Sequence, residues 1–174
     1  MVAAESAVKF IPGNSQHIGA RDEQQDSFGF SDPYDTEFVA HAGLLAVVAD
    51  GMGGMAQGKV ASKSAVDSFL KAYMSKTPGE SIPAALSRAL DQAASTVLSL
   101  GRENGLQGEI GTTLVAAAVR GQLLYWTSAG DSRLYLVRQG RATQLTVDHV
   151  YARELDQQVA KGLISRSYAA EHPE

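Results

Sequence analysis

An apolar run that stops at a carboxylate is the feature that most constrains this chain. Residues 44–49 read Leu-Leu-Ala-Val-Val-Ala, Asp50 follows at once, and three of the next four residues are glycine. A run of this kind, closed by Gly, predicts a buried strand with Asp50 at its end. Glycines carry no side chain, so the backbone after Asp50 can approach a metal ion or a phosphate closely. A tight turn with Asp50 as a helix N-cap is the structural alternative.

Composition is that of an ordinary globular protein. The chain has 174 residues, of which 44% are hydrophobic and 20% charged, enough for one domain with a buried core. A net charge of −4 argues against a nucleic-acid partner. The absence of cysteine excludes disulfides, thiolate catalysis and Cys-ligated zinc. We expect neither a signal peptide nor a membrane span, and therefore a cytoplasmic protein with no membrane partner.

The hydrophobic periodicity predicts an α+β protein. In the first part of the chain we expect strands over 8–11, 26–30 and 43–49, a loop over 31–36, and helices over 56–74 and 82–100. A meander of four strands is then expected over 112–119, 123–128, 133–137 and 142–145. Beyond His149 the pattern becomes helical again. Strands, a helical hairpin and more strands favour helices packed on antiparallel sheet over alternating βαβ units.

Three acidic segments lie where strands are expected to begin or end. They contain Asp26 with Arg21 before it, Asp50 with Gly51, and Asp131 in a turn of the meander. Carboxylates without His or Cys nearby suit Mg²⁺ or Mn²⁺, and an arginine suits bidentate phosphate binding. Together they indicate metal-assisted hydrolysis of a phosphate ester. Each alone also fits a structural role, because Asp favours turns and a lone Arg is commonly a solvated charge.

Five motifs in order resemble the PPM-type (type 2C) metal-dependent serine/threonine protein phosphatases in their bacterial form. They are Arg21 with Asp26, Asp50–Gly54 with Ala61-Ser62, Gly111-Thr112-Thr113, Ala129–Tyr135, and Leu145–His149. The matches cover nearly the whole chain from about residue 16. Any one motif is weak, whereas five in family order are specific.

The resemblance implies a site with two Mn²⁺ or Mg²⁺ ions and an additional, weaker third one. Asp50 would bridge the two ions, the Gly51 carbonyl would ligate one of them, and Asp26 would hold metal-bound water. Arg21 would clamp the substrate phosphate, and Asp131 would contribute to the third ion. In the implied reaction a metal-bridging hydroxide attacks phosphoserine or phosphothreonine in one step. The implied fold is an antiparallel β-sandwich flanked by helices in α-β-β-α layers.

Two departures from the family pattern stand out. Gln25 occupies a position that is usually Glu in eukaryotic members. Family domains also continue into strands with two more Asp ligands, in an Asp-Gly and an Asp-Asn segment that this chain lacks. We therefore expect a single phosphatase-type domain over residues 1–174 without its C-terminal strands, ending in a flap-like helical segment from about residue 151. A fragment of a longer protein is preferred over a degenerate domain.

Two functions follow from this interpretation. The first is a metal-dependent phosphatase that acts on phosphorylated proteins and opposes a cognate Ser/Thr kinase. The alternative is a non-catalytic phosphatase-like module that binds phosphoproteins or kinases without turnover. A phosphatase for small molecules has less support, because no nucleotide-binding signature accompanies the glycines.

Overall fold

The computed structural model describes residues 10–52, 55–149, 155 and 158–171. The chain divides into two compact units, Met1–Ser128 and Ala129–Glu174. Among the described helices, none combines the length and the apolar character that crossing a membrane requires.

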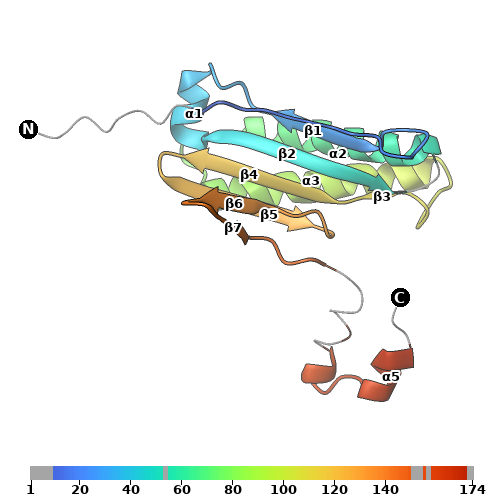
Figure 1. Cartoon of the computed structure of the whole chain (residues 1–174). Coiled ribbons are helices and arrows are strands. Elements are labelled where there is room, and N and C mark those ends of the chain that lie inside the picture. The colour runs from blue at the N-terminus through green and yellow to red at the C-terminus, as the bar shows by residue number, and fades with distance from the viewer. Residues whose placement is uncertain (1–9, 53–54, 150–154, 156–157, 172–174) are drawn as a thin grey trace, which may run out of the picture. The chain divides into compact units, whose positions relative to one another are not determined.

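A five-stranded antiparallel sheet with two long helices on one face forms the first unit (Figure 1). Its elements are β1 (Asp26–Phe30), α1 (Thr36–Ala42), β2 (Leu44–Met52), α2 (Met55–Met74), α3 (Ile82–Glu103), β3 (Gly111–Thr112), β4 (Leu114–Arg120) and β5 (Leu123–Ala129). The strands lie in the order β1-β2-β4-β5, and the short β3 pairs with the end of β2. The expected α+β class, with antiparallel sheet and flanking helices, is confirmed.

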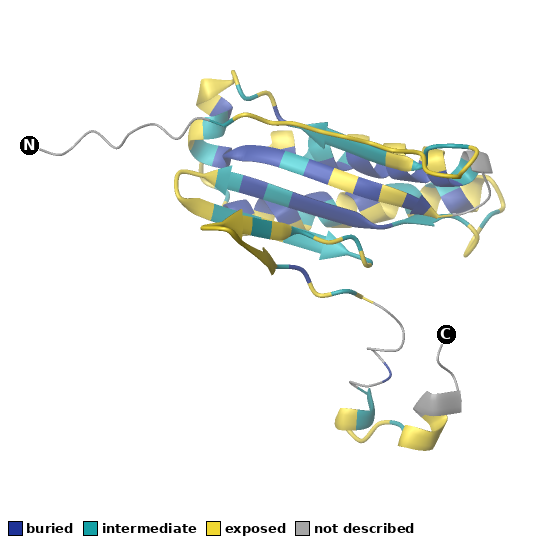
Figure 2. Ribbon diagram, viewed as in Figure 1, coloured by how far each residue is buried: buried dark blue, intermediate teal, exposed yellow. Residues whose placement is uncertain are grey.

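The core of this unit lies between β2, β4 and the helices. Leu45, Val47 and Ala49 alternate along β2 and are at most 1% exposed, as are Phe69 and Tyr73 of α2. Because successive strand residues point to opposite faces, the alternate residues, Val48 and Asp50 among them, lie on the face away from the helices. Figure 2 shows the buried residues concentrated along β2 and β4.

The second unit contains the hairpin of β6 (Tyr135–Arg138) and β7 (Arg141–Gln144). Its turn is Gln139-Gly140, as expected, and both residues have positive φ, 52° and 71°. Two positive φ values suit the right-handed twist of a hairpin. Leu155 and residues 158–160 are helical, and α5 covers Arg166–Glu171. The remaining residues of the helical segment predicted after His149 lie outside the described part.

The structure divides the predicted four-strand meander between two sheets, with β4 and β5 in one sheet and β6 and β7 in the other. It also corrects four details of single elements. The strand predicted over 8–11 is wrong at residues 10 and 11, which have no regular structure, and residues 8 and 9 lie outside the described part. The helix α1 was not predicted, although Asp35 caps its start, accepting a bond from the Phe38 amide, and Gly43 ends it at φ 77°. The available signal was an Asp, a Gly, and between them Phe38 and Ala42, two apolar residues four positions apart.

The other two corrections have physical causes that lie in tertiary contacts. The second long helix does not stop before Gly101 but continues to Glu103. Glycine suits position 101 because a Cβ there would lie only 3.1 Å from the Ile110 side chain. The strand predicted over 112–119 is interrupted at Thr113 and forms β3 and β4. The Asp50 amide donates to the Thr113 hydroxyl at this point. A side chain thus takes the place of a backbone carbonyl, and this interrupts the regular ladder.

Candidate metal and phosphate site

Two of the predicted site carboxylates face each other across neighbouring strands. Asp26 begins β1 and Asp50 lies near the end of β2, and the two are direct partners in the antiparallel register. The Gly51 amide donates to the Gln25 carbonyl at 3.2 Å, so the hydrogen bonds flank the Asp26–Asp50 pair. In such a pair the Cα atoms are only about 4.5 Å apart and the side chains project to the same face. Both residues are exposed.

Like charges directly opposite each other destabilise a sheet. The arrangement of Asp26 and Asp50 is therefore unfavourable for the isolated sheet and becomes favourable with a cation between the carboxylates. Among the residues that the structure describes, no third His, Cys, Asp or Glu completes a cluster with this pair. Two carboxylates are fewer ligands than a dinuclear site needs.

Two threonines hold the backbone of Asp50 from the side of β3. The Asp50 carbonyl accepts bonds from the Thr113 amide at 2.9 Å and from the Thr112 hydroxyl at 2.8 Å. The Asp50 amide donates to the Thr113 hydroxyl at 3.1 Å. The Gly-Thr-Thr motif thus has a defined role, because it holds the peptide groups on both sides of the Asp50 Cα atom.

The loop before β1 is attached to helix α2. Glu23 forms an ion pair with Lys59 at 3.1 Å, and the Gln25 carbonyl accepts a bond from the Ser62 hydroxyl. The side-chain oxygen of Gln25 lies against Gly58, 2.6 Å from the position of an added Cβ. In the sequence Ser62 is only part of a motif, and Gly58 has no predicted role. The available signal for both was their place in the first turns of the helix that follows the strand carrying Asp50.

The two glycines Gly51 and Gly58 bring β2 and α2 into direct backbone contact. A Cβ on Gly51 would overlap the Gly58 carbonyl, and a Cβ on Gly58 would lie 3.0 Å from the Gly51 carbonyl oxygen. Glycine at both positions therefore leaves room around the carbonyl that the family resemblance gives to a metal ion. Two carboxylates beside a glycine carbonyl form an oxygen-only donor set, which fits Mg²⁺ or Mn²⁺. Asp50 and the Gly51 carbonyl would hold the ion, and Asp26 would hold a water bound to it.

Arg21 lies in an exposed turn before the site. Its amide donates to the Ile18 carbonyl at 3.3 Å, and Gly19 in the turn has a φ of 65°. The turn is also closed by the Gly19 amide, which donates to the His17 ring at 2.9 Å. Within the described part of the chain the Arg21 guanidinium forms no ion pair. A phosphate group could therefore bind to it without breaking an existing salt bridge.

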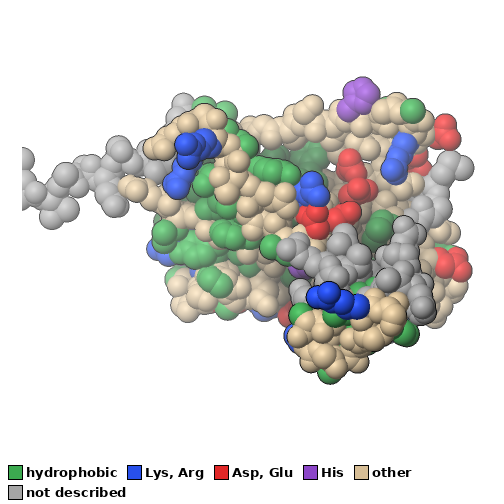
Figure 3. All heavy atoms as spheres, turned by 60° about the horizontal axis from the view of Figure 1, so that its bottom comes forward, with side chains coloured by type: hydrophobic (Ala, Val, Ile, Leu, Met, Phe, Trp, Pro, Cys, Tyr) green, Lys and Arg blue, Asp and Glu red, His purple; other side chains and the backbone are tan. Residues whose placement is uncertain are grey.

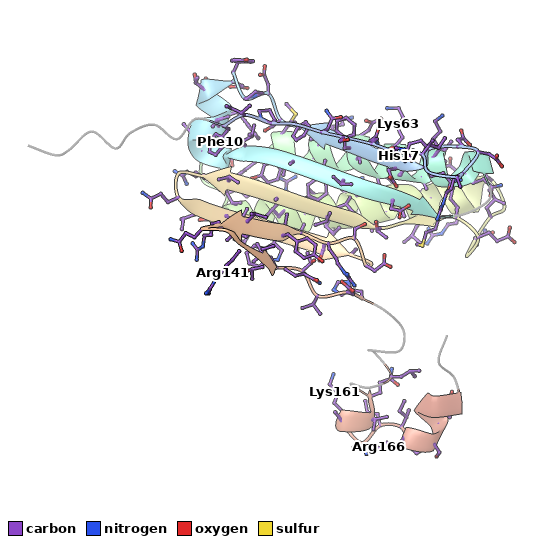
Figure 4. The ribbon with its side chains drawn as sticks, viewed as in Figure 1. Phe10, His17, Lys63, Arg141, Lys161 and Arg166 are labelled. Carbon is purple, nitrogen blue, oxygen red and sulfur yellow. The ribbon has the colours of Figure 1, made fainter. Side chains whose placement is uncertain are left out.

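The segment before this turn lies at the open edge of β1. Gln16 donates to the Asp26 carbonyl at 3.3 Å, and in Figure 4 its neighbour His17 lies at this end of the sheet, with Phe10 at the other end beside α1. On the face drawn in Figure 3, Lys and Arg side chains are scattered among other residues. A single arginine, rather than a continuous basic area, is thus the phosphate-binding candidate of this site.

Asp131 belongs to the second unit, in the turn after β5. The neighbouring Arg133 binds the Asp148 carboxylate through Nε at 3.1 Å to each oxygen and Nη2 at 2.6 Å to one of them. The His149 amide also donates to the Gly130 carbonyl at 3.0 Å. Hydrogen bonds to Asp148 raise the pKa of Arg133 above its ordinary value. The fourth and fifth motifs of the resemblance therefore hold each other and fix the turn that carries Asp131.

Comparison with known proteins agrees with these motifs. Residues 14–156 match the family described as protein phosphatase 2C. The chain is 38% identical over 136 residues to the serine/threonine protein phosphatase PstP of Mycobacterium tuberculosis, which is 78% of this chain and 25% of that protein. It is 37% identical over 133 residues to the serine/threonine phosphatase Stp of Listeria welshimeri, which is 74% of this chain and 51% of that protein.

A solved structure shows the same relationship in three dimensions. The catalytic domain of PstP in complex with two manganese ions aligns with a TM-score of 0.61 and 30% identity, over 86% of this chain and 58% of that one. The chain thus spans a quarter to about half of the two curated relatives described above. The resemblance inferred from five motifs is confirmed, and the chain belongs to the protein phosphatase 2C family.

Proposed function

We propose that this chain forms part of a metal-dependent phosphatase that hydrolyses phosphoserine and phosphothreonine in proteins. One observation carries the proposal: Asp26 and Asp50 are placed opposite each other on β1 and β2, in a chain of the protein phosphatase 2C family. Two close carboxylates with oxygen-only surroundings suit Mn²⁺ or Mg²⁺. The two manganese ions in the PstP catalytic domain support two ions for the complete site.

The residues divide the work by their chemistry. Asp50 and the Gly51 carbonyl would hold the ions, Asp26 would orient a coordinated water, and Arg21 would bind the phosphate oxygens. Asp131 would serve the additional third ion. Two bound divalent cations would supply a hydroxide nucleophile for a single-step attack, by lowering the pKa of coordinated water, and would offset charge on the phosphate.

The substrate is a phosphorylated protein, which requires a Ser/Thr kinase as the enzyme that supplies it. The relatives PstP and Stp are serine/threonine phosphatases, and a related structure, PppA of Pseudomonas aeruginosa, is a regulatory component of a type VI secretion system. A signalling role in the cytoplasm follows from this proposal.

A non-catalytic module that binds phosphoproteins or kinases is the second candidate. One observation favours it: the described residues bring only two carboxylates, Asp26 and Asp50, to the site, with no larger acidic cluster. A site that holds a single ion could bind a phosphate group without activating water efficiently.

Release of phosphate from a phosphothreonine peptide separates the two candidates. With Mn²⁺ we expect slow hydrolysis by this chain that Asp50→Ala abolishes and that chelation of the metal stops. Asp67→Ala, which removes an exposed carboxylate of α2, is the matched control and should retain the rate. Activity that persists in Asp50→Ala or after chelation would overturn the metal mechanism. Peptide binding with no turnover at any Mn²⁺ concentration would favour the second candidate.

A further inference from the structure

A pair of hydroxyl groups, those of Ser27 and the buried Ser62, joins β1 to α2 next to Asp26. Ser62 of α2 is 0% exposed, and its hydroxyl lies 3.0 Å from that of Ser27, the second residue of β1. Ser62 also lies within hydrogen-bonding distance of the Gln25 carbonyl, directly before Asp26, and 3.2 Å from the Lys59 carbonyl in its own helix. The predicted function of the chain assigns no role to either serine.

The direction of these hydrogen bonds follows from counting protons. The carbonyls of Gln25 and Lys59 can only accept, and the Gln25 oxygen is the nearer of the two, so the single proton of the Ser62 hydroxyl is directed mainly to Gln25. The Ser62 oxygen can then accept from Ser27, whose own proton is available for that bond. The result is a series of two hydrogen bonds, from Ser27 to Ser62 and from Ser62 to the Gln25 carbonyl. This arrangement is partly shielded from water, where hydrogen bonds are stronger than in bulk solvent.

The Gln25 carbonyl connects these hydrogen bonds to the site. It accepts from Ser62 of α2 and also from the Gly51 amide of β2, at 3.2 Å. The first bond restrains the peptide that leads into Asp26, and the second restrains the peptide that follows Asp50. A single oxygen atom therefore links three elements at the point where the two carboxylates face each other.

Packing alone does not require a hydroxyl at this position. Alanine would fill nearly the same volume and has the higher helix propensity, and the Gln25 carbonyl would keep its bond from Gly51 without Ser62. Removing the Ser62 hydroxyl should thus loosen the placement of Asp26 more than it destabilises the fold.

We propose that Ser62 is a positioning residue, which holds the Gln25 carbonyl from helix α2 and so keeps Asp26 in its place opposite Asp50 at the metal site. The proposal rests on the function proposed above, because it concerns the same metal site. Groups that hold metal ligands in place without touching the metal commonly account for about ten-fold or more in affinity.

Binding of Mn²⁺ to the chain, measured by electron paramagnetic resonance of the free ion, tests this role without any assay of turnover. We expect Ser62→Ala to weaken Mn²⁺ binding about ten-fold, with little change in the urea midpoint of unfolding. Ser27→Ala removes only the hydroxyl that donates to Ser62 and should weaken Mn²⁺ binding roughly three-fold, since Ser62 can still donate to Gln25. This second variant also keeps the test open should Ser62→Ala not fold.

Val66→Ala is the matched control for loss of stability. Val66 lies in the same helix, is 3% exposed and packs near Gly29 of β1, but has no polar group. We expect it to lower the urea midpoint and leave Mn²⁺ binding unchanged. Unchanged Mn²⁺ binding in Ser62→Ala, or equal weakening in Val66→Ala, would overturn the positioning role alone. A wild-type chain that binds no Mn²⁺ at millimolar concentration would overturn the metal site and the positioning role together.

Discussion

At the scale of single residues, the site depends on the backbone around Asp50 more than on its neighbours' side-chain charges. Thr112 and Thr113 bond to both peptide groups of Asp50, and the next amide, that of Gly51, bonds to Gln25. Gly51 also lies directly against the backbone of Gly58 in α2. Because backbone atoms of two packed elements cannot move apart independently, this is a position where only glycine fits.

Gly51→Ala should therefore be strongly destabilising. An added Cβ would overlap the Gly58 carbonyl, and overpacking against backbone costs about 2 kcal/mol or more of the free energy of unfolding. Gly111→Ala in the adjacent strand is the control, since its Cβ would meet nothing closer than the Met52 methyl at 3.4 Å. Urea denaturation of both variants gives the comparison. Equal stability of the two variants would contradict the close approach of β2 and α2.

At the scale of elements, the α2–α3 hairpin is closed by one arginine. Arg88 of α3 donates through Nη1 to the Ala72 carbonyl in the last turn of α2 at 2.8 Å. Its Nε and Nη2 each donate to the carboxylate of Glu80, in the connecting turn, at 2.8 Å. The arginine thus binds a carbonyl in the last turn of α2, which also accepts from the Ser75 hydroxyl at 2.7 Å, and fixes the turn at the same time.

This ion pair makes the stability of the hairpin depend on pH. Hydrogen bonds from Arg88 hold the pKa of Glu80 below its ordinary value. A carboxylate whose folded pKa is lowered stabilises the fold above its unfolded pKa, and this stabilisation is lost as the pH falls through the folded value. We expect Glu80→Gln to lower the free energy of unfolding at pH 7 by at most about 1 kcal/mol, because the pair is partly exposed.

The difference between Glu80→Gln and wild type should shrink as the pH is lowered through the acidic range, where wild-type Glu80 also becomes neutral. Asp67→Asn is the control, because its pair with Lys63 is more exposed and should contribute less. Denaturation curves at several pH values measure both variants. A difference between Glu80→Gln and wild type that stays constant down to acid would show that Glu80 acts through packing rather than charge.

At the scale of the whole molecule, the chain forms two compact units that meet within β5 in the sequence. The first unit has the layered core. The second is organised by polar contacts, which are the Arg133–Asp148 ion pair and the bond from the Gln144 side-chain amide to the Asp148 carboxylate at 3.3 Å. Units with few buried apolar contacts open locally at lower free energy than a layered core.

Arg133→Ala should therefore affect the second unit only. We expect faster hydrogen exchange at the amides of Leu145 and His149, which bond to Leu134 and Gly130, and unchanged exchange in β2 and β4. Arg133→Lys keeps the charge but loses the bidentate geometry, and should give an intermediate increase. Amide exchange followed by NMR or mass spectrometry measures this. Faster exchange throughout the first unit would contradict separate local opening.

Local signals were sufficient to predict most elements. The buried strand that carries Asp50 near its end, the two long helices and the Gln139-Gly140 turn all follow from apolar periodicity or turn residues that act within a few positions. The short α1 and the interruption of the meander at Thr113 were not predicted. The first is only two turns long, and the second depends on Asp50, which is 63 residues away in the chain.

The sequence by itself determined the chemistry of this protein: which residues are carboxylates, where the glycines lie, and which five motifs occur in family order. Only the tertiary structure decided which of these residues meet. It places Asp26 opposite Asp50, joins Gln25 to Ser62, and brings Gly51 against Gly58. The reason is physical, because strand register and helix docking minimise the free energy of the packed layers, a property of many distant residues together rather than of any local pattern.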